Sequence, residues 1–307
     1  MLSIVTTLYK SEPTINSFYV SASAVAKSIF ENNYEIIFVN DGSPDHSLSI
    51  AVNISEKDMH VSVVDLSRNF GHYNAMMAGL EFAQGDLIFL IDSDMEENPN
   101  WLKEFYQTLK NSSCDVVYGV QKKRKGKLIE RLMGRFFYRL INYLSEENMP
   151  VNIVTSRLMT RKYLDALLLH KECQLYMAGI WYITGFEQVP MSVKKESASK
   201  STYTIHKQFN ILFDAITSFS IKPLKLIASL GFGISLISFI IICYLFLQKI
   251  FFFKPLDGWT SLMILITFMS GLIILFLGII GIYIAKIYLE SKKRPRSIIR
   301  NIYKGKG

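Results

Sequence analysis

The chain has 307 residues, 50% of them hydrophobic, and a mean hydropathy of +0.23, which is high for a protein that is soluble throughout. Most of its net charge of +8 lies in the last 22 residues, so the charge does not indicate a nucleic-acid-binding surface. Cys114, Cys173 and Cys243 are odd in number and far apart, which excludes a disulfide framework and predicts a reducing compartment. The chain begins without a basic segment and a long apolar run, so we expect no secretory signal.

The first two thirds of the chain alternate between short apolar runs and helical patterns. We expect strands at residues 2–9, 34–39, 61–66, 87–91 and 115–120, and helices at about 13–32, 73–83 and 100–109. The turn after the second strand contains Gly42 and Pro44, and Asp45 or Ser47 would cap the helix that follows. This alternation predicts an α/β domain with a parallel sheet and helices on both faces.

Carboxylates stand where two of these strands end. Asp92 and Asp94 follow the apolar run of residues 87–91, and Asp41 follows the second strand. In open α/β sheets, ligands bind in the crevice outside the carboxyl ends of the strands, so one crevice can collect all three. A divalent cation that carries a diphosphate would compensate their charge. Taken alone, the short Asp-x-Asp pattern is also typical of an acidic turn, and Asp41 of an ordinary turn residue.

The last third of the chain is a membrane module by composition. Residues 226–247 carry no charge, and 22 residues at about 1.5 Å each extend about 33 Å, enough to cross the hydrocarbon core. A second uncharged run predicts another span at about 260–286, within a module of residues 226–288. The connection between the spans carries few charges and residues 289–307 form a basic tail, so we expect both termini and the domain of residues 1–204 in the cytoplasm. Gly271, Gly278 and Gly281 would let the two helices approach closely.

Two amphipathic segments precede the spans. Residues 128–145 combine an apolar, aromatic face with a row formed by Arg131, Arg135 and Arg139, and residues 205–225 repeat the apolar face just before the first span. Such a helix can lie in the headgroup layer of a membrane. For residues 128–145 the alternative is an ordinary helix packed on the sheet.

In order and spacing, the chain resembles the family 2 glycosyltransferases of the GT-A fold. It is most similar to the membrane-anchored polyisoprenyl-phosphate glycosyltransferases, relatives of dolichol-phosphate mannose synthase and of bactoprenol glucosyltransferases. The segments that carry the resemblance are residues 34–43, 66–72, 92–94, 115–120 and 216–224. The resemblance implies a Rossmann-like, mostly parallel sheet, a nucleotide-sugar donor, a polyprenyl phosphate acceptor and a homo-oligomer.

The resemblance also implies roles for individual residues. Asp92 and Asp94 would be the catalytic residues and would bind Mg²⁺ or Mn²⁺ that bridges the donor diphosphate. The implied donor-binding residues are Thr7, Tyr9, Glu12, Asp41, Arg68, His72 and Ser93. Arg68 and His72 have the alternative of an exposed loop charge and a helix-capping imidazole. The residues expected near the acceptor phosphate are Arg131, Arg135, Arg157 and Lys200.

The chain departs from the family pattern where relatives carry a Gly-Asp-Phe-Arg segment. Here the sequence is Val154-Thr155-Ser156-Arg157, so the acidic residue often assigned as the catalytic base is replaced by Thr155. A lipid phosphate needs no base, because it is already an anion near pH 7. A sugar hydroxyl would need one, for which Glu147 and Glu187 are the candidates. Glu96 likewise replaces an amide near the diphosphate, and Asn40 replaces the first aspartate of the usual Asp-Asp-Gly-Ser.

We therefore expect inverting, metal-dependent transfer of a sugar to undecaprenyl phosphate at the cytoplasmic face of a bacterial inner membrane, for the synthesis or modification of surface polysaccharide. The first alternative is the same transfer to a sugar hydroxyl of a lipid-linked glycan. The second is a catalytically inactive membrane scaffold, which the altered segment at Thr155 motivates.

Overall fold

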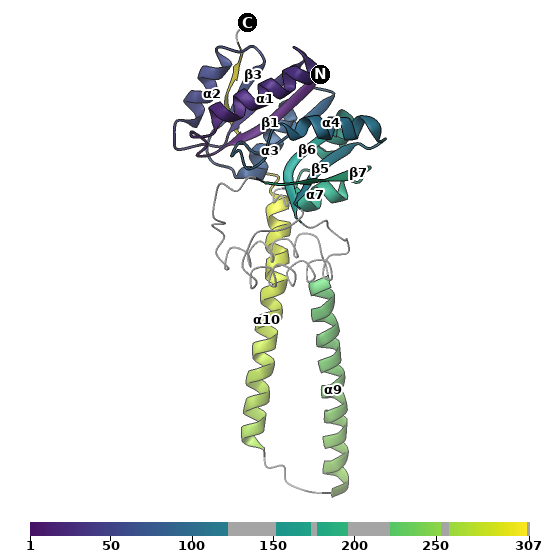
Figure 1. The fold of residues 1–307 in the computed structure, drawn as a ribbon. Coiled ribbons are helices and arrows are strands. Elements are labelled where there is room, and N and C mark those ends of the chain that lie inside the picture. Colours follow the sequence, from purple (N-terminus) through teal and green to yellow (C-terminus); the bar gives the residue numbers. More distant parts are fainter. Residues whose placement is uncertain (122–151, 173–176, 196–221, 253–257, 306–307) are drawn as a thin grey trace. The chain divides into compact units, whose positions relative to one another are not determined.

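The computed structural model describes residues 1–121, 152–172, 177–195, 222–252 and 258–305 (Figure 1). The amphipathic segments expected at residues 128–145 and 205–225 lie outside this range, except for residues 222–225. The chain divides into two compact units, one built on a sheet and one made of two long helices, and each is described by itself.

The sheet unit contains eight strands in the order β7-β5-β6-β4-β1-β2-β3-β8. The strands are β1 Leu2–Leu8, β2 Tyr34–Asn40, β3 Val61–Leu66, β4 Leu87–Leu90, β5 Val116–Gln121, β6 Ile153–Thr160, β7 Gln188–Val193 and β8 Ile299–Lys304. Four pairings are parallel, whereas β6 runs antiparallel to β4 and β5, and β8 runs antiparallel to β3. The mostly parallel α/β sheet confirms the expected fold class.

The helices of this unit are α1 Ile15–Phe30, α2 Ser47–Ser55, α3 His72–Phe82, α4 Trp101–Asn111, α6 Arg161–Leu167 and α7 Met177–Ile183. Strand β1 is buried along its whole length because helices cover both of its faces. On one face, Phe18 of α1 packs edge-on against Phe38. On the other, Gly79 lets α3 lie flat on the sheet: a Cβ there would stand 2.6 Å from Val39 Cγ2 and 2.7 Å from Val5 Cγ1.

The order of the strands creates a crevice beside β1. From β1 the chain moves outward through β2 and β3, and then returns to the opposite side of β1 as β4. The strands β1 and β4 are neighbours, and the chain therefore leaves them in opposite directions along the sheet. A ligand binds at such a switch point in open α/β sheets.

The C-terminal segment differs from the basic tail that the sequence predicted. Its residues 299–304 form β8, which pairs with the outer edge of β3, for example Val64 with Ile302. Arg300 Nη2 donates to Ser67 O at 2.6 Å, and its Nη1 lies 3.6 Å from the buried Asp65 carboxylate. Part of the basic charge therefore neutralises an internal carboxylate, and β8 covers an otherwise exposed strand edge.

The second unit contains α9 Lys222–Phe252 and α10 Trp259–Ser291. Within the residues searched, Phe268–Ser291 is long and apolar enough to cross a membrane, and Leu224–Ile234 is a shorter apolar stretch. Large apolar side chains of this span are exposed, as Ile274 is at 70%. Among the described residues, the expected close approach at the three glycines is not seen, because a Cβ at Gly271, Gly278 or Gly281 would meet no atom within 4 Å.

Candidate active site

The two predicted catalytic aspartates lie in the loop that follows β4. Asp92 is half-buried and Asp94 is exposed. The loop turns sharply because Met95 adopts a left-handed conformation with φ of 61°, and Asp94 Oδ1 accepts a hydrogen bond of 2.9 Å from Glu96 N. The turn holds the Asp94 carboxylate close to the strand end.

His72 connects this loop to the end of β1. Its Nδ1 lies 3.0 Å from Thr7 Oγ1, and its Nε2 lies 3.3 Å from Asp92 Oδ1. His72 is the first residue of α3, so the helix that packs flat on β1 and β2 sets the position of the imidazole. The structure thus brings together Thr7, His72 and Asp92 from three separate segments.

The charges of this group shift one another's protonation equilibria. Burial raises the pKa of Asp92, but attraction to His72 outweighs it and the net shift is downward. Burial lowers the pKa of His72, but Asp92 outweighs that effect and the net shift is upward. For Asp94, partial burial and the charge of Asp92 both raise the pKa. Asp92 is therefore held as a carboxylate next to an imidazole that favours its charged form.

The side chains of two predicted donor-binding residues, Ser93 and Asp41, form hydrogen bonds within the protein. Ser93 is buried, and its hydroxyl donates to Thr7 O at 2.8 Å, which ties the Asp92 loop to β1. Asp41 is also buried, and its carboxylate accepts from Phe70 N at 2.7 Å and Gly71 N at 3.1 Å. Burial raises the pKa of Asp41 despite these two hydrogen bonds. Both side chains shape the loops around the crevice.

The loop after β1 carries the other predicted donor-binding residues. Tyr9 is exposed, at 49%. Glu12 is half-buried, and its Oε2 accepts from His46 N at 3.2 Å. Asp45 receives hydrogen bonds from Glu12 N at 3.2 Å and Ser47 N at 3.1 Å, so it joins this loop to the start of α2. The N-cap position of α2 is His46, and neither of the predicted capping residues, Asp45 and Ser47, occupies it.

Glu97 is a third carboxylate in the segment after β4, and the sequence analysis assigned no role to it. Glu97 is fully buried and accepts from Thr155 N at 3.1 Å and Ser156 N at 2.8 Å. Lys195 Nζ lies 2.9 Å from Glu97 Oε1. Burial raises the pKa of Glu97 against the opposing charge of Lys195. The only sequence signal was the position of Glu97 in the acidic run after β4, because its partners come from β6 and from the segment after β7.

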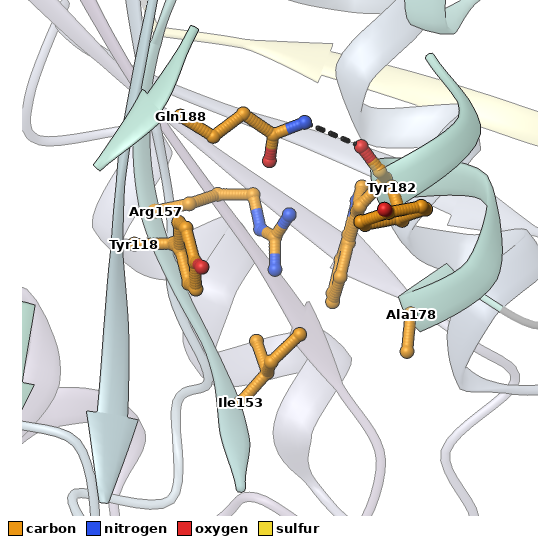
Figure 2. Close-up of a pocket in the computed structure, with 7 residues that line it drawn as sticks. Tyr118, Ile153, Arg157, Ala178, Tyr182 and Gln188 are labelled. Atoms are coloured by element: carbon orange, nitrogen blue, oxygen red, sulfur yellow. Dashed lines mark hydrogen bonds between the residues drawn. The ribbon is translucent and has the colours of Figure 1, made fainter. Parts of the chain in front are cut away.

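Arg157, predicted to contact an acceptor phosphate, is 1% exposed. It lies on β6, where its guanidinium stacks on Trp181 and points into a small pocket among Tyr118, Gln188 and Ile153 (Figure 2). Burial lowers its pKa to about 9, and its Nη2 has no hydrogen-bond partner within the described residues. The structure therefore places the Arg157 side chain inside the domain.

The remaining predicted residues are separate from this group. Arg68 lines a cavity with Arg294 and Arg296 from the segment after α10. The candidate base Glu187 is exposed, and its backbone carbonyl pairs with β5. Arg131, Arg135, Lys200 and Glu147 lie outside the described residues.

The chemistry of the two aspartates fits a divalent cation. Asp92 Oδ1 lies 3.3 Å from His72 Nε2, and a carboxylate offers further lone pairs, so Asp92 and the exposed Asp94 can both contribute oxygens to a cation. Carboxylate oxygens are the ligands that Mg²⁺ and Mn²⁺ prefer. Across the same residues, no group of three metal-ligating side chains is found, so a cation held here would take further ligands from a substrate or from water.

Comparison with known proteins places the chain among sugar transferases. The family model described as glycosyl transferase family 2 matches residues 3–168. A Mycobacterium tuberculosis protein named as a glycosyltransferase is 46% identical over 98% of this chain and 88% of its own length. The bactoprenol glucosyl transferase of Shigella phage SfV is 31% identical over 98% of both chains. A crystal structure of M. tuberculosis glucosyl-3-phosphoglycerate synthase with phosphoglyceric acid has a TM-score of 0.50 and 16% identity, and covers 72% of this chain and 80% of that chain, which supports the fold alone.

Proposed function

Because the chain belongs to glycosyl transferase family 2, we propose that it transfers a sugar from a nucleotide-sugar donor to the phosphate of a polyprenyl lipid, with inversion at the anomeric carbon. The observation that carries this proposal is the group of Thr7, His72 and Asp92 at the switch point of a sheet that is covalently joined to an apolar, membrane-length helix. The name of the SfV relative, a bactoprenol glucosyl transferase, supports a polyprenyl acceptor.

Asp92 and Asp94 are the residues that would hold Mg²⁺ or Mn²⁺. When bound, such a cation stabilises negative charge on the departing diphosphate. His72 and Thr7 orient the Asp92 carboxylate, and Ser93 ties its loop to β1. These residues hold the site before the substrate arrives, which lowers the cost of organising it during the reaction.

The transfer is a single displacement. A phosphate oxygen of the lipid forms a bond to the anomeric carbon, while the bond between that carbon and the diphosphate oxygen breaks and the nucleoside diphosphate leaves with the electron pair. A phosphate monoester is already an anion near pH 7, since its second pKa is about 6, so no protein group has to remove a proton. Thr155, which cannot act as a base at neutral pH, is compatible with this acceptor.

A glycan acceptor would require a base that the described residues do not offer near Asp92. Glu97 is a further carboxylate of this segment, but it is fully buried and paired with Lys195. Glu187 is an exposed surface residue. The arrangement therefore favours the phosphate acceptor.

The pairing of β8 with β3 supports two membrane crossings. The chain before α9 and the chain after α10 contribute strands to the same sheet, so both must lie on the same side of the membrane. If α10 crosses the membrane, the chain has to cross a second time, and α9, with 31 residues, is long enough at about 1.5 Å per residue. The basic residues that follow α10 favour the cytoplasm for the sheet unit and both termini.

The proposal is tested with the purified full-length protein and a panel of labelled sugar nucleotides. Undecaprenyl phosphate, undecaprenol and a lipid-linked glycan serve as parallel acceptors, each with Mn²⁺ and with EDTA. We expect product from one donor with undecaprenyl phosphate alone, and none with EDTA. Product only on the glycan, or equal product with EDTA, would contradict the proposal.

A further inference from the structure

Positive charge gathers at one further place in the sheet unit, outside the group formed by Thr7, His72 and Asp92. Arg68, Arg294 and Arg296 line a cavity of about 210 Å³ together with Phe70 and Asn74. Arg68 comes from the loop between β3 and α3, whereas the other two arginines follow α10, more than 220 residues later in the chain. Folding of β8 against β3 brings these segments together.

Two of these arginines, Arg68 and Arg296, are held in place by neutral groups. The Arg68 guanidinium lies 4.2 Å from the centre of the Phe70 ring, and its Nη1 donates to Asn69 O at 3.1 Å. Arg296 Nε donates to Glu172 O at 3.1 Å, and its Nη2 donates to His170 O. Within the described residues, neither Arg68 nor Arg296 forms an ion pair with a carboxylate. Positive charge held in place by neutral carbonyls and an aromatic ring is suited to an anion from outside the protein.

The size of the cavity and its position restrict the anion. Its volume is below the roughly 300–1,000 Å³ of sites that enclose a drug-sized ligand, so it suits a phosphate group better than a whole nucleotide sugar. Arg294 is three residues beyond Ser291, the end of the membrane-length helix, and three residues span at most about 11 Å. The chain therefore keeps this arginine close to the headgroup layer.

The same cavity is connected to the active site through one loop. Asp41 accepts hydrogen bonds from Phe70 N and Gly71 N, and the next residue is His72, which lies beside Asp92. His72 is the fourth residue after Arg68, at most about 14 Å along the chain. A phosphate bound at the cavity would thus be near the crevice.

From these observations we infer that Arg68, Arg294 and Arg296 bind a phosphate group carried by the acceptor lipid. This inference rests on the proposed function for the identity of the lipid. The same chemistry would suit the diphosphate of the donor, and the experiment separates the two sources.

The test measures binding and turnover separately on the full-length protein in phosphatidylcholine nanodiscs. Labelled farnesyl phosphate is the binding probe, with farnesol as a competitor that has the same tail and no phosphate. The variants are Arg68→Gln and the double variant Arg294→Gln/Arg296→Gln. Lys304→Gln is the control, because it removes the same charge from an exposed position on β8. Because Arg296 also anchors a loop, the thermal midpoint of each variant shows whether it is folded, and Arg68→Gln provides an independent reading.

We expect the Kd for farnesyl phosphate to rise about tenfold or more in both arginine variants, as expected for loss of a hydrogen bond to a charged group, and to stay unchanged in Lys304→Gln. Farnesol should not compete. In turnover, the KM for undecaprenyl phosphate should rise and the KM for the donor should not. Unchanged Kd values, or a rise in the donor KM alone, would overturn the inference.

The two proposals can fail independently. Suppose that the wild-type protein glycosylates only glycans and that the arginine variants lose farnesyl phosphate binding. This result would support the phosphate site in the cavity and refute the proposed acceptor. Suppose instead that the protein glycosylates undecaprenyl phosphate and that the KM for this acceptor is unchanged in both variants. This result would support the proposed function and refute the phosphate site in the cavity.

Discussion

Asp92 is held in its charged form by a neighbouring residue. His72 Nε2 lies 3.3 Å from Asp92 Oδ1, and attraction to His72 outweighs burial and lowers the pKa of the carboxylate. A carboxylate has lone pairs for more than one partner, so this pairing is compatible with a cation at the same side chain. Asp92 is therefore the residue at which metal binding is tested most directly.

Asp92→Asn should abolish metal-dependent transfer while leaving the fold intact. The amide keeps the shape of the side chain and removes the charge that a cation needs, so we expect activity to fall about a hundredfold or more. The measurement is the initial rate of sugar transfer at saturating Mn²⁺, with the thermal midpoint as a check on folding. Ser112→Ala is a control in the same unit, away from the crevice. Wild-type rates in Asp92→Asn would contradict the assignment.

Asp45 should stabilise the fold in a way that depends on pH. Burial opposes ionisation, but hydrogen bonds from Ser43, Ser47 and Glu12 outweigh it and lower the pKa of Asp45 from 3.8 to about 2. Because the pKa is lowered in the folded state, the stabilisation is fully present above about pH 5 and is lost as the pH falls towards 2. We expect Asp45→Asn to cost about 1 kcal/mol at pH 7 and less at pH 3. Thermal midpoints of both proteins at the two pH values measure this difference, and an equal or larger loss at pH 3 would argue against it.

At the scale of elements, the sequence predicted β1 to β5 but did not reveal β6, β7 and β8. The apolar runs that predicted the first five strands are local, and residues 87–91 and the aspartates after them could be recognised from neighbouring residues alone. Strand β8 reads Ile-Arg-Asn-Ile-Tyr-Lys, and its charges resembled a cytoplasmic tail. Its partner β3 is more than 230 residues earlier, and nothing in a local pattern specifies such a pairing.

The same limit explains which parts of the site were missed. Thr7, His72 and Asp92 were each predicted to line the site, but their mutual contacts depend on the packing of α3 against the sheet. The pairing of Glu97 with Lys195 depends on the position of the segment after β7. Ser93 and Asp41 were predicted to contact the donor, and a sequence could not show that both side chains also bond to the backbone of neighbouring segments.

Removing β8 should destabilise the sheet unit. Truncation after Ser297 deletes the strand, exposes the edge of β3 and leaves the buried Asp65 without the nearby charge of Arg300. We expect a lower thermal midpoint and aggregation of the truncated protein, measured by differential scanning fluorimetry and size-exclusion chromatography. Truncation after Gly305 keeps β8 and serves as the control. Equal midpoints for the two truncated proteins would show that β8 contributes little to stability.

For the whole molecule, the shared sheet constrains the path of the chain through a membrane. Strands from both sides of the helical unit pair in one sheet. Among the described residues, Phe268–Ser291 is the helix that is long and apolar enough to cross a membrane. If it does cross, the two crossings proposed above follow from the connectivity of the chain.

Cysteine labelling tests this topology. In a variant without the native Cys114, Cys173 and Cys243, a cysteine at Lys254 should react with a membrane-impermeant maleimide in intact spheroplasts. A cysteine at Lys304 should react only after lysis, because it lies on β8 at the cytoplasmic side. Labelling of both positions in intact spheroplasts, or of neither, would contradict two crossings with a cytoplasmic sheet.

The most direct test of the account is the mass of the lipid that the enzyme produces. Purified protein is incubated with Mn²⁺, undecaprenyl phosphate and the donor that supports turnover, and the extracted lipid is analysed by mass spectrometry beside an Asp92→Asn reaction. The account predicts undecaprenyl phosphate enlarged by one sugar residue, with a single phosphorus atom, and no such lipid in the Asp92→Asn reaction. A product that carries a second phosphate, or unmodified lipid beside a glycosylated glycan, would contradict it.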